Sequence, residues 1–186
     1  RIVAAPTAGA CGVLPAVLVP YFQKRCKDTD KILKAMYVAA GIGQIIATRS
    51  SISGAAGGCQ AEIGSASSMA AGALTYLQGG NCEQIATAAA MAMKNLLGLV
   101  CDPVAGLVEV PCVKRNVIGT VNAMSAADMA MAGITSRIPP DQVMDAMKEV
   151  GDKMDASLRE TALGGLARTE EGVKIAEKMH ASQENW

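Results

Sequence analysis

The sequence predicts a compact, all-α, multi-helix domain, and three features support this fold class. Only 3% of the 186 residues are aromatic, whereas 51% are hydrophobic and many of these are alanine. The chain also has 19 glycines and 11 methionines, a composition that favours small side chains between closely packed helices. No segment alternates apolar and polar residues as a half-buried strand would. A β-sandwich or barrel would normally carry more Val, Thr and Tyr.

The first half of the chain carries two helical signals. Asp28 can cap a helix in which apolar residues recur at three- and four-residue spacing to about Ile46. A second helix is expected over residues 59–77, because the two glycines at 79–80 would end it.

The second half shows four more helices and two loops, marked by caps, glycines or prolines. We expect a helix over 82–97 after Asn81, an ordered loop over 101–111, a helix from Pro111 to about Gly133, an amphipathic helix around Val143–Val150, a glycine-containing loop over 161–168 and a short final helix after Thr169.

Charge and hydropathy exclude several classes of protein. The 17 basic and 17 acidic residues balance, so nothing indicates nucleic-acid or anionic-membrane binding. The uncharged stretches 2–23 and 63–82 are interrupted by prolines or polar residues, and we interpret both as buried segments rather than membrane spans. We see no export signal, so we expect a cytoplasmic protein in which the six cysteines are ligands or buried thiols rather than disulfides. Because the chain opens at Arg1 rather than Met, we expect residues 1–186 to be a single domain that is truncated at its N-terminus and belongs to a longer protein.

The first candidate site is the glycine-rich stretch from Ser50 to Glu62. Its glycines allow unusual backbone angles and close approach to a bound group. Cys59 is expected at a helix N-terminus, where free N–H groups and the helix dipole favour a thiolate. Glu62, three residues on, shares a face with Cys59. The alternative is a tight turn between packed helices with Cys59 as a small buried apolar group.

The second candidate site lies between Cys101 and Cys112. Neither the separation of these cysteines nor that from Cys59 matches a zinc half-site or a ferredoxin motif. Cys112 nevertheless follows a proline at an expected helix start. Arg115 and Asn116 follow on the same face and could receive a carboxylate, although they could equally form a solvated helix start.

Three thiols without a fourth partner suggest a particular inorganic group. A structural zinc site needs four protein ligands, and the single histidine, His180, lies in an amphipathic tail where a solvated side chain is the simpler interpretation. A four-iron cluster held by three cysteines keeps one iron open to water or substrate.

Taken together, these stretches resemble the catalytic alpha chain of the iron–sulfur-dependent L-serine dehydratase family. The resemblance rests on Ser-Gly-Ala at 53–55, Gly-Cys-Gln-Ala-Glu-Ile-Gly at 58–64, Ser-Met-Ala-Ala at 68–71, Cys-Asp-Pro-Val-Ala-Gly-Leu-Val-Glu-Val-Pro-Cys at 101–112, and the tail at 158–167. The opening Ala-Pro-Thr at 5–7, with Gly9 and Gly12, also resembles the family, whereas Ala8 and Cys11 depart from its pattern.

The resemblance implies a [4Fe-4S] lyase that deaminates L-serine to pyruvate and ammonia without pyridoxal phosphate, in amino-acid catabolism and gluconeogenesis. It implies Cys59, Cys101 and Cys112 as the cluster ligands. The remaining cysteines are expected not to be ligands; they are Cys11, Cys26 and Cys82. The open iron would activate the substrate hydroxyl while a base removes the Cα proton.

The other site residues are expected to be polar groups near the same loops. The candidate catalytic residues are Ser53, Glu62 and Ser65. The candidate substrate-binding residues are Thr7, Ser68, Arg115 and Asn116. The identity of the base stays open between a serine and a residue outside this chain.

The family implies a beta chain or a fused beta domain as partner, and a homo- or hetero-oligomer. Because no cysteine stands near Trp186, we expect the two-chain type, with the fourth iron open. Two alternatives remain: a related L-cysteine desulfhydrase, and a non-catalytic iron–sulfur sensor. The neutral charge and the absence of a basic helix argue against a sensor that binds DNA.

Overall fold

The computed structural model describes residues 1–183 and confirms the all-α fold. The α-helices in this range are α1 (Val13–Tyr21), α2 (Thr29–Arg49), α3 (Gly54–Gly57), α4 (Ser65–Leu77), α5 (Cys82–Lys94), α6 (Cys112–Met131), α7 (Pro140–Lys153) and α8 (Glu170–Gln183). Within residues 1–183 there is no strand, and β-type pairing is limited to an isolated bridge between Cys101 and Arg159. The chain end at Trp186, used above for the fourth iron position, lies outside the described residues.

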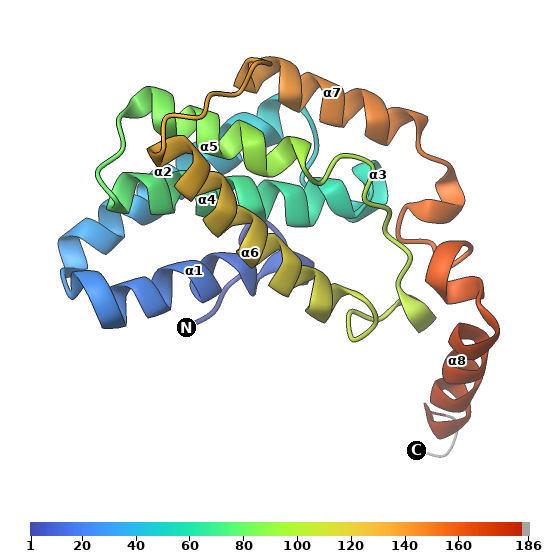
Figure 1. Ribbon diagram of the computed structural model, residues 1–186. Helices are drawn as coiled ribbons and strands as arrows, with labels where there is room; N and C mark the ends of the chain where they lie inside the picture. The colour runs from blue at the N-terminus through green and yellow to red at the C-terminus, as the bar shows by residue number, and fades with distance from the viewer. Residues whose placement is uncertain (184–186) are drawn as a thin grey trace.

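Helix α4 forms the centre of the fold (Figure 1), and α1, α2, α5 and α6 pack against it. All of its residues except Tyr76 are buried. A helix enclosed on every side needs small side chains so that its neighbours can approach. At Gly72, an added Cβ would lie 2.2 Å from Ile42 Cδ1 of α2, so no larger residue fits there without a shift.

Two serine hydroxyl groups of this central helix donate to backbone carbonyls of neighbouring helices. Ser67 Oγ donates to the carbonyl of Gly119 in α6, and Ser68 Oγ donates to the carbonyl of Ala89 in α5, each at 2.8 Å. Of the uncharged segment 63–82, residues 63–77 are therefore buried apart from Tyr76, as expected, whereas none of 78–82 is buried. The expectation for 2–23 was met only in part, since residues 2–4 are exposed. None of the helices in residues 1–183 is long and apolar enough to cross a membrane.

Two helices begin at the caps that the sequence indicates. The Asp28 carboxylate accepts a hydrogen bond from Lys31 N at the start of α2. Asn81 and Gln84 form a reciprocal capping box at the start of α5.

One predicted helix boundary was wrong in detail and another was confirmed. Helix α5 ends at Lys94 rather than near residue 97, and the chain then turns through Gly98, whose φ is +84° and whose N–H donates to Gln60 Oε1. The chain is helical over 59–77 as expected, with a π-helical turn at Gln60–Gly64. The glycine-rich stretch before it contains the one-turn helix α3.

The C-terminal part lies beside the loop that carries Cys101. Helix α7 packs against α5 and α3, whereas α8 contacts the 3-10 turns Val104–Gly106 and Gly165–Arg168. Figure 1 shows α8 at the edge of the molecule, away from α4. His180 is exposed on α8, which agrees with its interpretation as a solvated histidine.

Candidate metal centre

Cys59 is fixed by a sharp turn and by the side chain of the residue that follows it. Gly58 has a φ of +74°, a left-handed conformation that favours glycine. The Gln60 side chain donates to Met147 O at 3.0 Å and accepts from Gly98 N at 2.9 Å. The backbone N–H of Gln60 donates to Leu99 O at 2.9 Å. Cys59 is consequently held in the core with 1% of its surface exposed.

Cys101 is held from the opposite side by the C-terminal segment. Its N–H donates to Leu158 O, and its carbonyl accepts from Glu160 N, both at 2.8 Å. These two hydrogen bonds form the isolated bridge of the fold. Cys101 is 2% exposed, so its thiol also lies in the interior.

A buried ion pair joins the Cys101 loop to the first turn of α6. Asp102 Oδ1 lies 2.8 Å from Arg115 Nη1, with side chains only 4% and 14% exposed, respectively. Asp102 Oδ2 accepts from Leu166 N, and Arg115 Nη1 also donates to Val100 O, again at 2.8 Å. Because Arg115 follows Cys112 by three residues, this pair fixes the position of one cysteine loop relative to the other.

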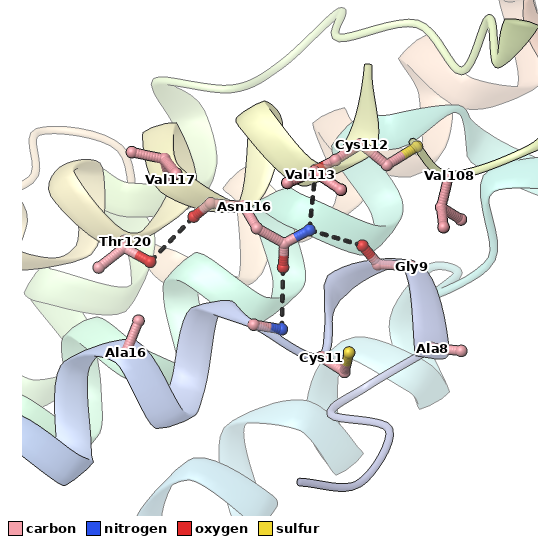
Figure 2. Close-up of a pocket in the computed structure, with 11 residues that line it drawn as sticks. Ala8, Gly9, Cys11, Ala16, Val108, Cys112, Val113, Asn116, Val117 and Thr120 are labelled. Atoms are coloured by element: carbon pink, nitrogen blue, oxygen red, sulfur yellow. Dashed lines mark hydrogen bonds between the residues drawn. The ribbon is translucent and has the colours of Figure 1, made fainter. Parts of the chain in front are cut away.

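Cys112 is the first residue of α6 and is 4% exposed. One turn later, Asn116 Nδ2 donates to Cys112 O and to Gly9 O, and its Oδ1 accepts from Gly12 N, as Figure 2 shows. Asn116 therefore joins the N-terminal loop to the start of α6.

The three thiols meet in the interior and change one another's acidity. Hydrogen bonding with Cys101, together with burial, raises the pKa of Cys59 to about 12, although Cys112 and the charge of Arg115 act in the opposite direction. Hydrogen bonding with Cys59 and burial likewise raise the pKa of Cys112. A helix N-terminus was expected to favour the thiolate of Cys59, whereas hydrogen bonding with Cys101 and burial shift its pKa the other way.

Glu62 brings a carboxylate to the same place. Its carboxylate and the Sγ atoms of Cys59 and Cys101 offer ligand atoms that all lie within 4.8 Å of one another. Glu62 Oε1 accepts a hydrogen bond from Thr7 Oγ1 at 2.8 Å. Burial raises the pKa of Glu62, and the hydrogen bonds from Thr7 and from the Gly54 backbone partly oppose that rise.

The other cysteines lie elsewhere. Cys82 is exposed at the start of α5, and Cys26 is half-buried and interacts with Asp28 O. Cys11 lines a cavity of about 340 Å³ together with Cys112 and Asn116 (Figure 2). Most of the lining is apolar, so this cavity does not resemble a site for free serine.

Comparison with known proteins shows the family. A family model described as serine dehydratase alpha chain matches residues 1–167. The chain belongs to this serine dehydratase family. The predicted resemblance is therefore confirmed.

Three curated relatives of the serine dehydratase family illustrate the extent of the match. The probable L-serine dehydratase alpha chain of Bacillus subtilis is 55% identical over 96% of this chain and 59% of its own length. The probable L-serine dehydratase alpha chain of Latilactobacillus sakei is 53% identical over 94% of this chain and 83% of its own length. The L-serine dehydratase alpha chain of Peptoniphilus asaccharolyticus is 51% identical over 94% and 60%. The chain thus spans 59% and 60% of the length of two of these relatives.

The structure places the remaining predicted residues of this serine dehydratase chain at different distances from the thiols. Ser53 precedes α3, next to the Gly54 backbone that faces Glu62. Ser65 lies three residues after Glu62, and its fully buried hydroxyl has no partner among the described residues. The Ser68 hydroxyl donates its hydrogen bond to Ala89 O at the α4–α5 interface. Arg115 uses Nη1 on protein groups, and no described residue accepts a hydrogen bond from its Nε or Nη2.

Sequence reasoning missed two residues that hold this site together, Asp102 and Gln60. Each is a polar residue directly after one of the candidate ligand cysteines. A buried carboxylate requires a cationic partner, so Asp102 beside Cys101 was a signal for such a partner, although it did not identify Arg115. Gln60 carried no comparable signal, because its partners are backbone groups of distant segments.

The residues present fit an iron–sulfur group. Three buried thiols converge from three separate segments, and thiolates are the ligands that hold iron–sulfur clusters. A Cβ at Gly54 would lie 3.1 Å from Cys101 Sγ, so this glycine leaves space beside the thiols that another residue would fill.

Proposed function

We propose that this chain is the catalytic part of an iron–sulfur L-serine dehydratase, converting L-serine to pyruvate and ammonia without pyridoxal phosphate. The observation that carries the proposal is the convergence of Cys59, Cys101 and Cys112 in the interior of a chain of this family. We assign these three residues as ligands of a [4Fe-4S] cluster. When bound, such a cluster supplies a Lewis-acidic iron for the departure of the substrate hydroxyl.

The group of three buried thiols is suited to release protons when a metal binds. The raised pKa of Cys59 keeps its thiol protonated in the metal-free chain. Ligation requires the thiolate, so cluster insertion releases protons while the metal compensates the new negative charge. The buried Asp102–Arg115 pair and the Gln60 side chain hold the cysteine loops in place during this exchange.

Substrate binding is assigned to the polar groups around the thiols. The unoccupied edge of Arg115 offers two donors in the planar arrangement that suits a carboxylate. Thr7 holds the Glu62 carboxylate, and Asn116 holds the backbone of the loop before α1, so both position the site from the N-terminal side. Ser68 acts through the packing of α4 on α5 rather than by touching substrate.

Removal of the Cα proton needs a base near the substrate. Within this chain we assign Ser53, Glu62 and Ser65 as the candidate catalytic residues. Glu62 is a carboxylate held beside two thiols, and Ser65 has a buried hydroxyl without a protein partner among the described residues. A base supplied from outside this chain stays the alternative.

We also infer that the chain works with a beta chain or a fused beta domain, in an oligomer. Three relatives are named alpha chains, which supports such a partner. The six cysteines are free, as a reducing cytoplasm would keep them.

Anaerobic reconstitution with ferrous iron and sulfide, followed by pyruvate and ammonia assays in the presence of the beta partner, tests this function. We expect thiolate-to-iron absorbance and pyruvate formation from L-serine. Sulfide release from L-cysteine at a higher kcat/KM than serine turnover would favour the desulfhydrase alternative. Cluster loading without either activity would favour a sensor.

A further inference from the structure

Three buried side chains bring possible metal-ligand atoms close together. The Sγ atoms of Cys59 and Cys101 and the Glu62 carboxylate all lie within 4.8 Å of one another. Cys112 contacts Cys59 but is not a member of this group. We propose that Cys59, Cys101 and Glu62 form a site for a single divalent transition-metal ion, with a ligand set different from that of the cluster.

The carboxylate is already oriented for this role. Thr7 Oγ1 donates to Glu62 Oε1 at 2.8 Å, which leaves Oε2 to face away from that hydrogen bond. Oε2 occupies a slot between two glycines: an added Cβ would lie 3.0 Å from it at Gly54 and 3.2 Å from it at Gly9. A carboxylate whose second oxygen is held in this way loses little further freedom when it binds a metal.

The donor set selects the class of ion. Two thiolates and a carboxylate suit Zn²⁺, Fe²⁺ or Co²⁺, whereas Mg²⁺ and Ca²⁺ prefer ligand sets made only of oxygen. Ligand atoms about 2.0–2.3 Å from one tetrahedral ion lie about 3.3–3.8 Å apart. A spacing of up to 4.8 Å therefore closes with a movement of about 1 Å.

The single-ion site has a consequence for cluster assembly. It uses two of the three proposed cluster ligands, so one chain cannot hold both groups at once. Glu62 is a ligand of the single ion only, whereas Cys112 is a ligand of the cluster only. The inference goes beyond the proposed serine dehydratase activity and does not depend on it.

Titration of the anaerobic, metal-free chain with Co²⁺ tests the site, since thiolate-bound tetrahedral Co²⁺ absorbs in the visible range. Glu62→Gln keeps an acceptor for Thr7 but removes the charged ligand, so we expect Co²⁺ affinity to fall at least about tenfold. Cys112→Ser should leave the affinity within about twofold of the parent. Unchanged affinity in Glu62→Gln, or a tenfold loss in Cys112→Ser, would overturn the assignment.

A pair of glycine substitutions tests the same site without removing a ligand. Gly54→Ala places a methyl group against Glu62 and Cys101, whereas at Gly64 the nearest atom, Leu96 Cβ, is 3.9 Å from the added Cβ. We expect Gly54→Ala to weaken Co²⁺ binding and Gly64→Ala to leave it unchanged, with helical circular dichroism preserved in both. Equal Co²⁺ affinity in these two folded variants would contradict the proposal.

Iron loading separates this inference from the proposed function. After reconstitution with iron and sulfide, Glu62→Gln should retain the cluster and Cys112→Ser should lose it, the reverse of their order in the Co²⁺ titration. If Glu62→Gln bound Co²⁺ as tightly as the parent while iron loading followed the expected order, only the single-ion site would be refuted. Failure of the parent chain to take up iron and sulfide would refute only the cluster.

Discussion

Cys112 and Cys82 occupy the same local position, yet the fold gives them opposite surroundings. Each is the first residue of a long helix, Cys112 of α6 and Cys82 of α5. Cys82 is exposed to solvent, whereas Cys112 is buried against Cys59. A helix N-terminus therefore does not by itself make a metal ligand; the difference lies in what other segments bring to it.

What they bring is a second and a third thiol, and these dominate the chemistry. Hydrogen bonding with Cys101 and burial raise the pKa of Cys59 to about 12, although Cys112 acts in the opposite direction and a helix start would favour the thiolate. The six cysteines therefore fall into two groups. Three thiols interact with one another, those of Cys59, Cys101 and Cys112. The other three show no interaction with another thiol among the described residues; they belong to Cys11, Cys26 and Cys82.

The largest expected effect contrasts the two groups directly. Cys59 interacts with both other thiols, so Cys59→Ser should abolish iron loading on anaerobic reconstitution. Cys82→Ser, at a matched helix start, should bind as much iron as the parent. Colorimetric iron and sulfide analysis measures both, and comparable iron contents in the two variants would remove the distinction between the groups.

The next effect concerns the ion pair that fixes the Cys101 loop to α6. Asp102→Ala leaves the buried Arg115 without its anionic partner and should cost about 3–5 kcal/mol in the free energy of unfolding, together with partial loss of iron loading. Asp145→Ala breaks the exposed pair with Arg49 and should leave the free energy of unfolding nearly unchanged.

Urea unfolding of these two aspartate variants provides the comparison. If Asp102→Ala were no less stable than Asp145→Ala, the buried pair would not be the element that fixes the cysteine loops.

A smaller effect is expected at Arg115 itself. Arg115→Lys keeps the charge but loses the planar group that pairs with Asp102 and that we propose binds the substrate carboxylate, so the serine requirement should rise by the equivalent of about 2 kcal/mol. Lys114→Arg, at the exposed neighbouring position, is the matched control. Steady-state kinetics with the complete enzyme measures both, and an unchanged KM for serine in Arg115→Lys would leave Arg115 only its structural role.

The smallest effect sharpens the boundary of the group of three interacting thiols. Cys11 lines the same cavity as Cys112 but interacts with no other thiol in the described contacts. Cys11→Ser should leave iron content and cluster absorbance unchanged. A drop in iron content would bring Cys11 into the ligand set.

Much of the fold was predictable because its signals are local. The caps at Asp28 and Asn81 are short-range features, and the structure confirms both. The small residues of α4 indicated a buried helix for the same reason. The end of α5 was missed because Gly98 is turned by a hydrogen bond to a side chain that is distant in the sequence, Gln60.

The candidate site was predictable in its cysteines but not in its supporting contacts. Glycine and proline marked the loops that carry Cys59 and Cys112, and the family resemblance grouped them with Cys101. The partner of Arg115 depends on how the Cys101 loop folds back on α6, which no local pattern contains. For the same reason, the sequence suggested Ser68 as a substrate-binding residue but not the hydrogen bond that its hydroxyl makes to Ala89 O between α4 and α5.

The central claim is that three cysteines from separate segments hold one iron–sulfur cluster, and the iron and sulfide content of Cys101→Ser tests it most directly. The anaerobically reconstituted parent chain should contain about four irons and four sulfides per chain with thiolate-to-iron absorbance. Cys101→Ser, folded by circular dichroism, should contain almost none of either. Iron and sulfide contents equal to those of the parent would contradict the claim.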